Sequence, residues 1–195
     1  MSNLILESNT TTSIEQLQSK TKPIKLTASE MDKEPEKWEF YELYNGEPFE
    51  MPYSKPEHAK IVAKLSYLIN HWIINQGGYG TTYSGEGGLR LSELNRYSYD
   101  VAWNYELVGE GKIPEKSMSL MVEVISESND VEKMLQKIQN YILYGAVEVW
   151  IILVHAQQMQ VYYSDFSAKL YSKDATYVPG DWMKGFSLKV ADLFI

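Results

Sequence analysis

The stretch Leu120-Met-Val-Glu-Val-Ile125 is an almost continuous apolar run, and Val147-Glu-Val-Trp-Ile-Ile-Leu-Val154 is a second one. Runs of this kind are typical of strands that are buried on both faces of a sheet. Residues 131–144 between them repeat apolar side chains at helical spacing, and Gly145 follows as the helix end. A strand, a helix and a second strand in this order predict a βαβ-like crossover.

The predicted helix of this crossover has a core stripe and a cap. Ser126-Glu-Ser-Asn-Asp130 supplies candidates for the N-cap. The side chains expected on the buried stripe are Val131, Met134, Leu135, Ile138, Tyr141 and Ile142.

Upstream of the crossover, Asn45-Gly46 lies between two alternating runs, Trp38–Tyr44 and Glu47–Met51. Asn-Gly in this setting is a strong signal for a β-hairpin. Ser54-Lys-Pro-Glu57 follows and predicts a helix start with Ser54 as N-cap and Glu57 as its capping-box partner.

That helix is expected to end near Asn75, because Gly77-Gly78 follows it. Its apolar stripe is Ile61, Leu65, Leu68 and Trp72, with His58 one turn earlier on the same inner side.

The remaining segments predict further strands. Short strand-like pieces alternate with glycines from Tyr79 to Leu91, where Gly77–Gly80 and Gly85–Gly88 are expected to form turns. Asp100–Tyr105 is expected to be a strand, and Met159–Tyr163 and Lys169–Tyr171 add antiparallel pieces. The expected fold is α/β, with a central mixed sheet (α+β) flanked by helices and an N-terminal β-hairpin.

At 195 residues the chain suits one domain, with residues 1–28 as a polar arm, including a short helical stretch near Ile14–Ser19, and 29–195 as the folded domain. The sequence has no cysteine, no apolar run of membrane-spanning length and no signal-peptide pattern at its start. A cytoplasmic location and no membrane partner are therefore expected.

The net charge of −8 weighs against strong non-specific binding to nucleic acid, which needs lysine and arginine to displace counterions from phosphate. Only two arginines, Arg90 and Arg96, are present.

Three side chains nevertheless suggest phosphodiester chemistry. Asp100 and Glu123 lie on predicted strands, and two carboxylates of one sheet can hold a hard divalent cation. Lys137, on the predicted helix, could stabilise charge or position an attacking water. Each has a simpler explanation, however: Asp100 as a turn cap, Glu123 in a buried ion pair, and Lys137 as a solvated helix lysine like Lys133.

Glu42 and His58 are weaker candidates as further ligands or proton-transfer groups. Spacing alone also allows Glu42 to be an exposed strand residue in the hairpin, and His58 to be a satisfied core histidine, which is the commoner case. The glycine clusters lack the Gly-Lys-Ser/Thr of a phosphate loop, and no arrangement of serine and histidine predicts a nucleophile triad.

Five stretches together resemble the small restriction-endonuclease-like proteins that are abundant in cyanobacterial genomes and belong to the PD-(D/E)XK nuclease superfamily. They cover most of residues 38–155 in the family's order. They are Tyr41-Glu-Leu-Tyr-Asn-Gly-Glu47, His58 with its helix, Tyr99-Asp-Val-Ala-Trp103, Val122-Glu-Val-Ile-Ser126, and Lys137-Ile-Gln-Asn-Tyr141 leading to 145–151.

This resemblance implies a restriction-endonuclease-like core in which Asp100 and Glu123 ligate Mg²⁺, with Mn²⁺ as a substitute. Lys137 would replace the lysine that is missing at Ile125, since this family typically supplies it from the helix. Glu42 and His58 match positions that the family places near the site. The backbone carbonyl of Val124 is the expected third ligand.

The sequence departs from the family pattern at two positions. Tyr99 replaces the usual proline, and Ser119 replaces an aspartate found in many members. The expected function is Mg²⁺-dependent hydrolysis of DNA by a homodimer. A non-catalytic binding module with the nuclease fold, and hydrolysis of a smaller phosphodiester, are the alternatives that fit the acidic charge better.

Overall fold

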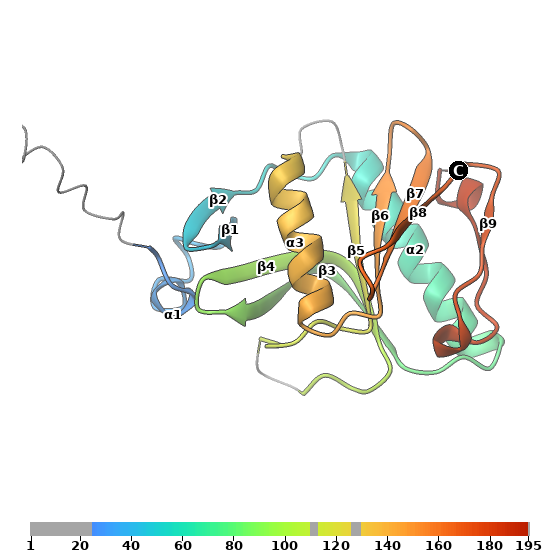
Figure 1. Ribbon diagram of the computed structural model, residues 1–195, viewed down its shortest axis with the longest axis horizontal. Helices are drawn as coiled ribbons and strands as arrows, with labels where there is room; N and C mark the ends of the chain where they lie inside the picture. The colour runs from blue at the N-terminus through green and yellow to red at the C-terminus, as the bar shows by residue number, and fades with distance from the viewer. Residues whose placement is uncertain (1–24, 110–112, 126–129, 195) are drawn as a thin grey trace, which may run out of the picture.

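The computed structural model describes residues 25–109, 113–125 and 130–194, with no account of the Glu86 side chain. A mixed sheet forms its centre (Figure 1), in the order β2-β1-β4-β5-β6-β7-β8, with β3 paired to β4. The strands are β1 (Tyr41–Tyr44), β2 (Glu47–Glu50), β3 (Thr81–Ser92), β4 (Asn95–Asn104), β5 (Leu120–Ile125), β6 (Glu148–Leu153), β7 (Gln158–Tyr163) and β8 (Ala168–Tyr171).

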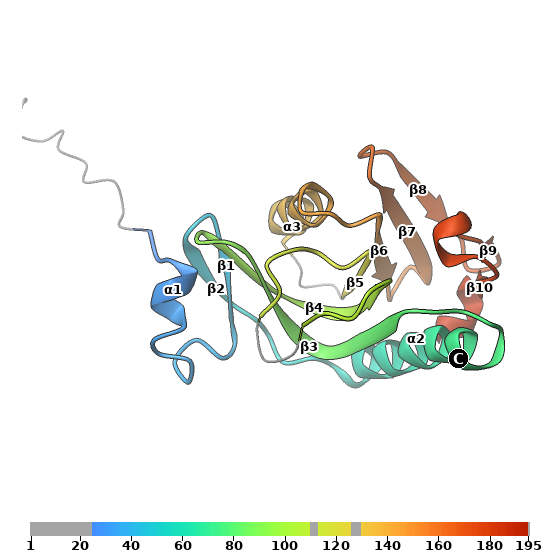
Figure 2. The ribbon, with the colours of Figure 1, turned by 90° about the horizontal axis from the view of Figure 1, so that it is seen from below.

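Two helices cover opposite faces of the sheet (Figure 2). α2 (Pro56–Asn75) packs Ile61, Leu65, Ile69 and Trp72 into a cluster with the even-numbered residues Leu120–Val124 of β5. α3 (Val131–Leu143) packs on the other face, where it meets Met121. Because side chains alternate along a strand, Glu123 shares the α3 face with Met121.

The crossover β5–α3–β6 has parallel strands, as predicted, with Glu123 opposite Ile151. The hairpin β1–β2 also forms as predicted, with Asn45 and Gly46 at positive φ in its turn. β7 and β8 continue the sheet antiparallel to β6.

The ends of the chain complete both layers. α1 (Ala28–Met31) packs against Leu43 of β1. After β8, the paired strands β9 (Thr176–Tyr177) and β10 (Leu188–Lys189) and the 3₁₀ turns η2 (Asp181–Met183) and η3 (Val190–Phe194) add apolar side chains to the α2 face. None of the described helices is both long and apolar enough to cross a membrane. Residues 1–24 of the predicted arm, including the helical stretch near Ile14–Ser19, lie outside the described residues.

One edge of strand β4 is paired with β3. Along its other edge β4 changes partner from β1 to β5, and this change positions the site. Near its start Leu43 of β1 is opposite Arg96, whereas near its end Val122 of β5 is opposite Val101. Residues 98–100 lie between these two pairings. Backbone groups there need other partners, because unpaired buried N–H and C=O groups are costly.

Strand assignments around β3 and β4 differ from the prediction. Gly85, Gly87 and Gly88 do not form turns but belong to the single strand β3, which has a register shift between Ser84 and Gly87. β4 begins at Asn95, not at Asp100, because Tyr97 and Tyr99 are buried in alternation with polar side chains. Two β3 residues therefore oppose one β4 residue at Asp100, which is the pattern of a β-bulge.

Two helix predictions also need correction. Lys55, and not Ser54, is the N-cap of α2, and it makes no side-chain capping bond. The reason is Pro56 at the first helical position, because a residue before proline is driven to extended backbone. In α3, Val131 and Leu135 are exposed, because the helix turns Lys137 inward beside the predicted Ile138, Tyr141 and Ile142. Asp130 caps α3, while residues 126–129 lie outside the described residues.

Candidate functional site

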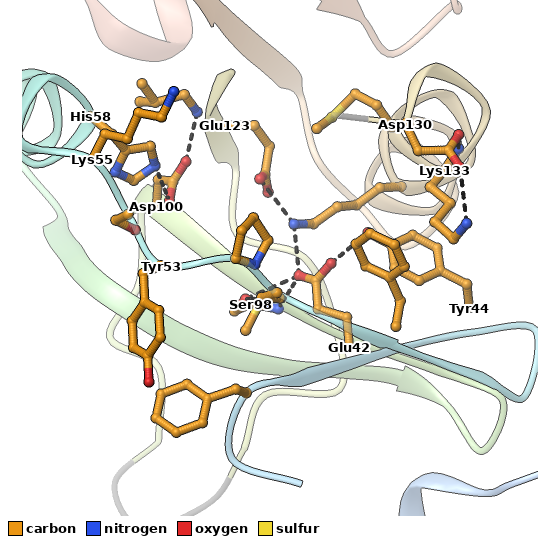
Figure 3. A pocket seen from close by; sticks show the side chains of 18 residues that line it. Glu42, Tyr44, Tyr53, Lys55, His58, Ser98, Asp100, Glu123, Asp130 and Lys133 are labelled. Atoms are coloured by element: carbon orange, nitrogen blue, oxygen red, sulfur yellow. Dashed lines mark hydrogen bonds and ion pairs between the residues drawn. The ribbon is translucent and has the colours of Figure 1, made fainter. Parts of the chain in front are cut away.

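A cavity of about 210 Å³ opens beside the point where β4 changes partners (Figure 3). The β1–β2 hairpin, the segment before α2, the middle of β4, the end of β5 and the start of α3 all contribute to its wall. The ionisable residues that line it are Glu42, Tyr44, Tyr53, Lys55, His58, Asp100, Glu123, Asp130, Lys133 and Lys137.

Lys137 lies between two carboxylates at the buried end of this cavity. Its Nζ is 2.8 Å from Glu42 Oε1 and 2.9 Å from Glu123 Oε2. The three side chains are 5–8% exposed. A hairpin strand, a central strand and a helix thus meet in one ion-pair network, which excludes a solvated Lys137 and an exposed Glu42.

Neutral donors hold both carboxylates in place. Tyr44 Oη donates to Glu42 Oε2 at 2.5 Å, and Tyr141 Oη donates to Glu123 Oε1 at 2.7 Å. Glu42 Oε1 also accepts from the backbone N–H of Ser98 at 2.8 Å, and Tyr141 Oη contacts the Ser98 carbonyl at 3.1 Å. The site network therefore satisfies the backbone of Ser98 on the edge of β4 that faces away from β3, where neither β1 nor β5 is paired with it.

Asp100 lies on the neighbouring strand, at the end of the cavity near α2. Its Oδ1 is 3.0 Å from His58 Nε2, and its Oδ2 accepts from the backbone N–H of Val124 at 2.6 Å. The Asp100 and His58 side chains are 13% and 15% exposed. His58 is thus not a core histidine that is satisfied away from the site.

The charges in the network shift one another's protonation. Burial disfavours the ammonium of Lys137, but the charges of Glu123 and Glu42 outweigh it and hold the pKa of Lys137 well above its usual range. Burial raises the pKa of Glu123, and the charge of Asp100 adds to that shift although Lys137 opposes it. Burial likewise raises the pKa of Tyr141 and of Tyr44, so both phenols remain donors.

Comparison with protein families identifies this architecture. The model of the Uma2 family, described as "Putative restriction endonuclease", matches residues 28–191. The chain belongs to the Uma2 family. The matched range includes Glu42, His58, Asp100, Glu123 and Lys137, and the family is the one that the sequence resemblance predicted.

A solved structure supports the fold of this Uma2 protein. It is titled a "putative nuclease belonging to DUF820" from Anabaena variabilis ATCC 29413, and it superposes with a TM-score of 0.68 at 17% identity. The alignment covers 79% of this chain and 89% of that one. No protein with a curated function matched the chain.

Nucleases with the restriction-endonuclease-like fold are typically metal-dependent, and the donors of this Uma2 site suit a hard cation. Each carboxylate has about four lone-pair positions, and the contacts described above use two on Asp100 and two on Glu123. When Glu42, Asp100 and Glu123 are all ionised, these three carboxylates and the Lys137 ammonium, leaving His58 aside, give an excess of two negative charges. A divalent cation would balance that excess.

In the described parts of the chain, no three His, Cys, Asp or Glu side chains form a metal-binding cluster.

The five predicted side chains, Glu42, His58, Asp100, Glu123 and Lys137, all line the one cavity, as does Val124. Sequence reasoning missed Tyr44, Ser98 and Tyr141, which connect them. Tyr141 was expected only as a core side chain. Tyr44 could have been predicted beside Glu42, because it follows Glu42 by two residues and so lies on the same side of β1.

Proposed function

We propose that this Uma2 protein is a Mg²⁺-dependent nuclease that hydrolyses phosphodiester bonds in DNA. The observation that carries the proposal is the bridge from Lys137 to Glu42 and Glu123 at one end of a cavity whose other end holds Asp100. A purely structural ion-pair network would not need a third carboxylate, that of Asp100, on the adjacent strand.

Asp100 and Glu123 would hold the cation, with the carbonyl of Val124 as a third ligand. The chemistry supplied by a bound divalent ion is polarisation of the phosphate and a lowered pKa of water. The protein's own groups orient these ligands: the Val124 N–H and His58 fix Asp100, while Tyr141 and Lys137 fix Glu123.

Lys137 would stabilise negative charge on the phosphate as the bond breaks. Its ammonium is held by two buried carboxylates, and its raised pKa keeps it protonated across the physiological range. A positioned, desolvated cation of this kind is worth more than the same charge in water. Glu42 would act as a positioning residue, since it bonds both Lys137 and Ser98.

The test is the conversion of supercoiled plasmid to nicked and linear forms with Mg²⁺, Mn²⁺ or EDTA. We expect metal-dependent cleavage that falls more than about 100-fold in Asp100→Asn and in Glu123→Gln. Glu132→Gln, an exposed position on α3 outside the cavity, is the matched control and should cleave at the wild-type rate. Equal cleavage by all four proteins, or cleavage that survives EDTA, would overturn the proposal.

The second candidate is a non-catalytic module that keeps the nuclease fold. The net charge of −8 with two arginines favours it, because phosphate backbones attract basic surfaces. Plasmid that stays intact in every metal, together with divalent-ion binding weaker than millimolar, would favour this candidate over the nuclease.

We also propose that residues 29–195 act as one unit and that two copies assemble, so that two active sites can address two DNA strands. Light scattering on the purified protein measures the second point directly. A monomer of 22.5 kDa at working concentrations would contradict it.

A further inference from the structure

Two aromatic rings lie in contact where the cavity meets solvent. Tyr53 and Phe40 both line the cavity, and their ring centroids are 6.0 Å apart at an interplanar angle of 51°. Tyr53 is 90% exposed and Phe40 is 47% exposed. In Figure 3, Tyr53 lies on the side of the cavity that also holds Asp100 and His58.

Exposed single aromatics are common on protein surfaces, and on their own they need no explanation. This pair differs because both rings line the cavity that contains the proposed metal ligands. The Tyr53 ring does not anchor the segment before α2, because a ring that is 90% exposed contributes little buried area. Its surface is open to a flat, apolar ligand group.

Cationic groups adjoin the same opening. Lys55 is exposed and, within residues 25–109, 113–125 and 130–194, takes part in no ion pair. On the opposite side Lys133 lies 4.7 Å above the Phe49 ring and 2.9 Å from Asp130. Rings beside lysines match the chemistry of a nucleotide, which has an aromatic base and an anionic phosphate.

The dimensions and charge of the cavity favour one unpaired nucleotide over a continuous duplex. Its volume of about 210 Å³ is small, and its inner wall is acidic. Duplex binding relies on many phosphate contacts, which a chain with two arginines supplies poorly. Base stacking tolerates any base and needs few cations.

We propose that Tyr53 and Phe40 form a stacking platform for an unpaired base next to the scissile phosphate, so that the substrate is single-stranded or locally opened DNA. This inference rests on the proposed nuclease function for the identity of the scissile bond. The stacking itself requires only the rings and Lys55.

The experiment measures binding of a short fluorescein-labelled oligothymidine, and of the same strand annealed to oligodeoxyadenosine, by anisotropy in EDTA at low salt. Tyr53→Ala should weaken binding of the single strand on the order of tenfold, and Phe40→Ala should act in the same direction. Tyr53→Phe should retain wild-type affinity, because stacking needs only the ring. Tyr67→Ala is the matched control, since Tyr67 is 58% exposed on α2 and does not line the cavity.

The proposal also predicts that wild-type protein binds the single strand more tightly than the duplex. It is overturned if Tyr53→Ala binds the single strand as well as wild type does, if Tyr67→Ala is equally impaired, or if duplex binding falls by the same factor. Because binding is measured without metal, its outcome is separate from catalysis. Tyr53-dependent binding, with neither plasmid nor single-stranded DNA cleaved in Mg²⁺ or Mn²⁺, refutes only the nuclease. Metal-dependent cleavage without Tyr53-dependent binding refutes only the platform.

Discussion

At the scale of single residues, Lys137 shows how little local spacing determines. Its position on the helix allowed either a solvated lysine or one that reaches a site, and the family resemblance favoured the site. In the structure it is buried with Glu42 and Glu123, which lie 95 and 14 residues away along the chain. Contacts over such separations leave no periodic signal in the sequence, which is also why Ser98, 56 residues from Glu42, was missed. Glu123 was easier to predict from the sequence as a site residue, because a charge inside an apolar strand is costly without a partner.

Replacing Lys137 by methionine should lower the free energy of unfolding by about 3–5 kcal/mol, because two buried carboxylates then lose their counter-charge. Urea denaturation measures the change. Lys133→Met on the same helix breaks only the more exposed pair with Asp130 and should cost about 1 kcal/mol or less. Similar losses in the two variants would show that the Lys137 network does not behave as a buried one.

At the scale of elements, the crossover β5–α3–β6 was predictable because its two strands are long apolar runs separated by a helical period. The β3–β4 pair was not, because the glycines in and beside its bulge resemble turn residues. Gly87 lies against the Tyr99 ring, so a side chain at position 87 would collide with it. The bulge lies opposite Asp100 and so helps to set where that carboxylate points.

Gly87→Ala should therefore destabilise the protein by about 1–3 kcal/mol through overpacking against Tyr99. Gly88→Ala is the matched control in the same strand, because a Cβ there meets its nearest neighbour, Ile113, only at 3.8 Å. We expect Gly88→Ala to be neutral or slightly stabilising. Thermal unfolding of the two variants makes the comparison, and a Gly87→Ala protein as stable as Gly88→Ala would contradict the packing seen at the bulge.

At the scale of the whole molecule, another buried carboxylate, outside the cavity, joins the C-terminal segment to the sheet. Glu148, at the start of β6, accepts from Trp150 Nε1 at 2.7 Å, from Tyr177 Oη and from Trp182 Nε1 at 3.3 Å. No cation of the described residues pairs with it. Sequence patterns predicted the buried strand but not this contact, because Tyr177 and Trp182 belong to short irregular elements.

Burial raises the pKa of Glu148 above its ordinary value of 4.5, although the three donors oppose the shift. A carboxyl with a raised pKa binds its proton more tightly in the folded state, so its ionisation destabilises the fold as pH rises above 4.5. Relative to Glu148→Gln, the wild-type protein should therefore lose stability between pH 4.5 and neutrality. Urea denaturation of both proteins across this range measures the difference in their free energies of unfolding. A difference that does not change with pH would contradict the prediction.

The central claim is that Asp100 and Glu123, on adjacent strands, bind one divalent cation beside Lys137. The most direct measurement is a crystal structure of the protein soaked in Mn²⁺, with the ion located by its anomalous signal. We predict one ion with carboxylate oxygens of both residues at about 2.1 Å, and no ion at this position in Asp100→Asn crystals soaked identically. A wild-type crystal without an ion at this site, from protein that hydrolyses DNA in Mn²⁺, would contradict the claim.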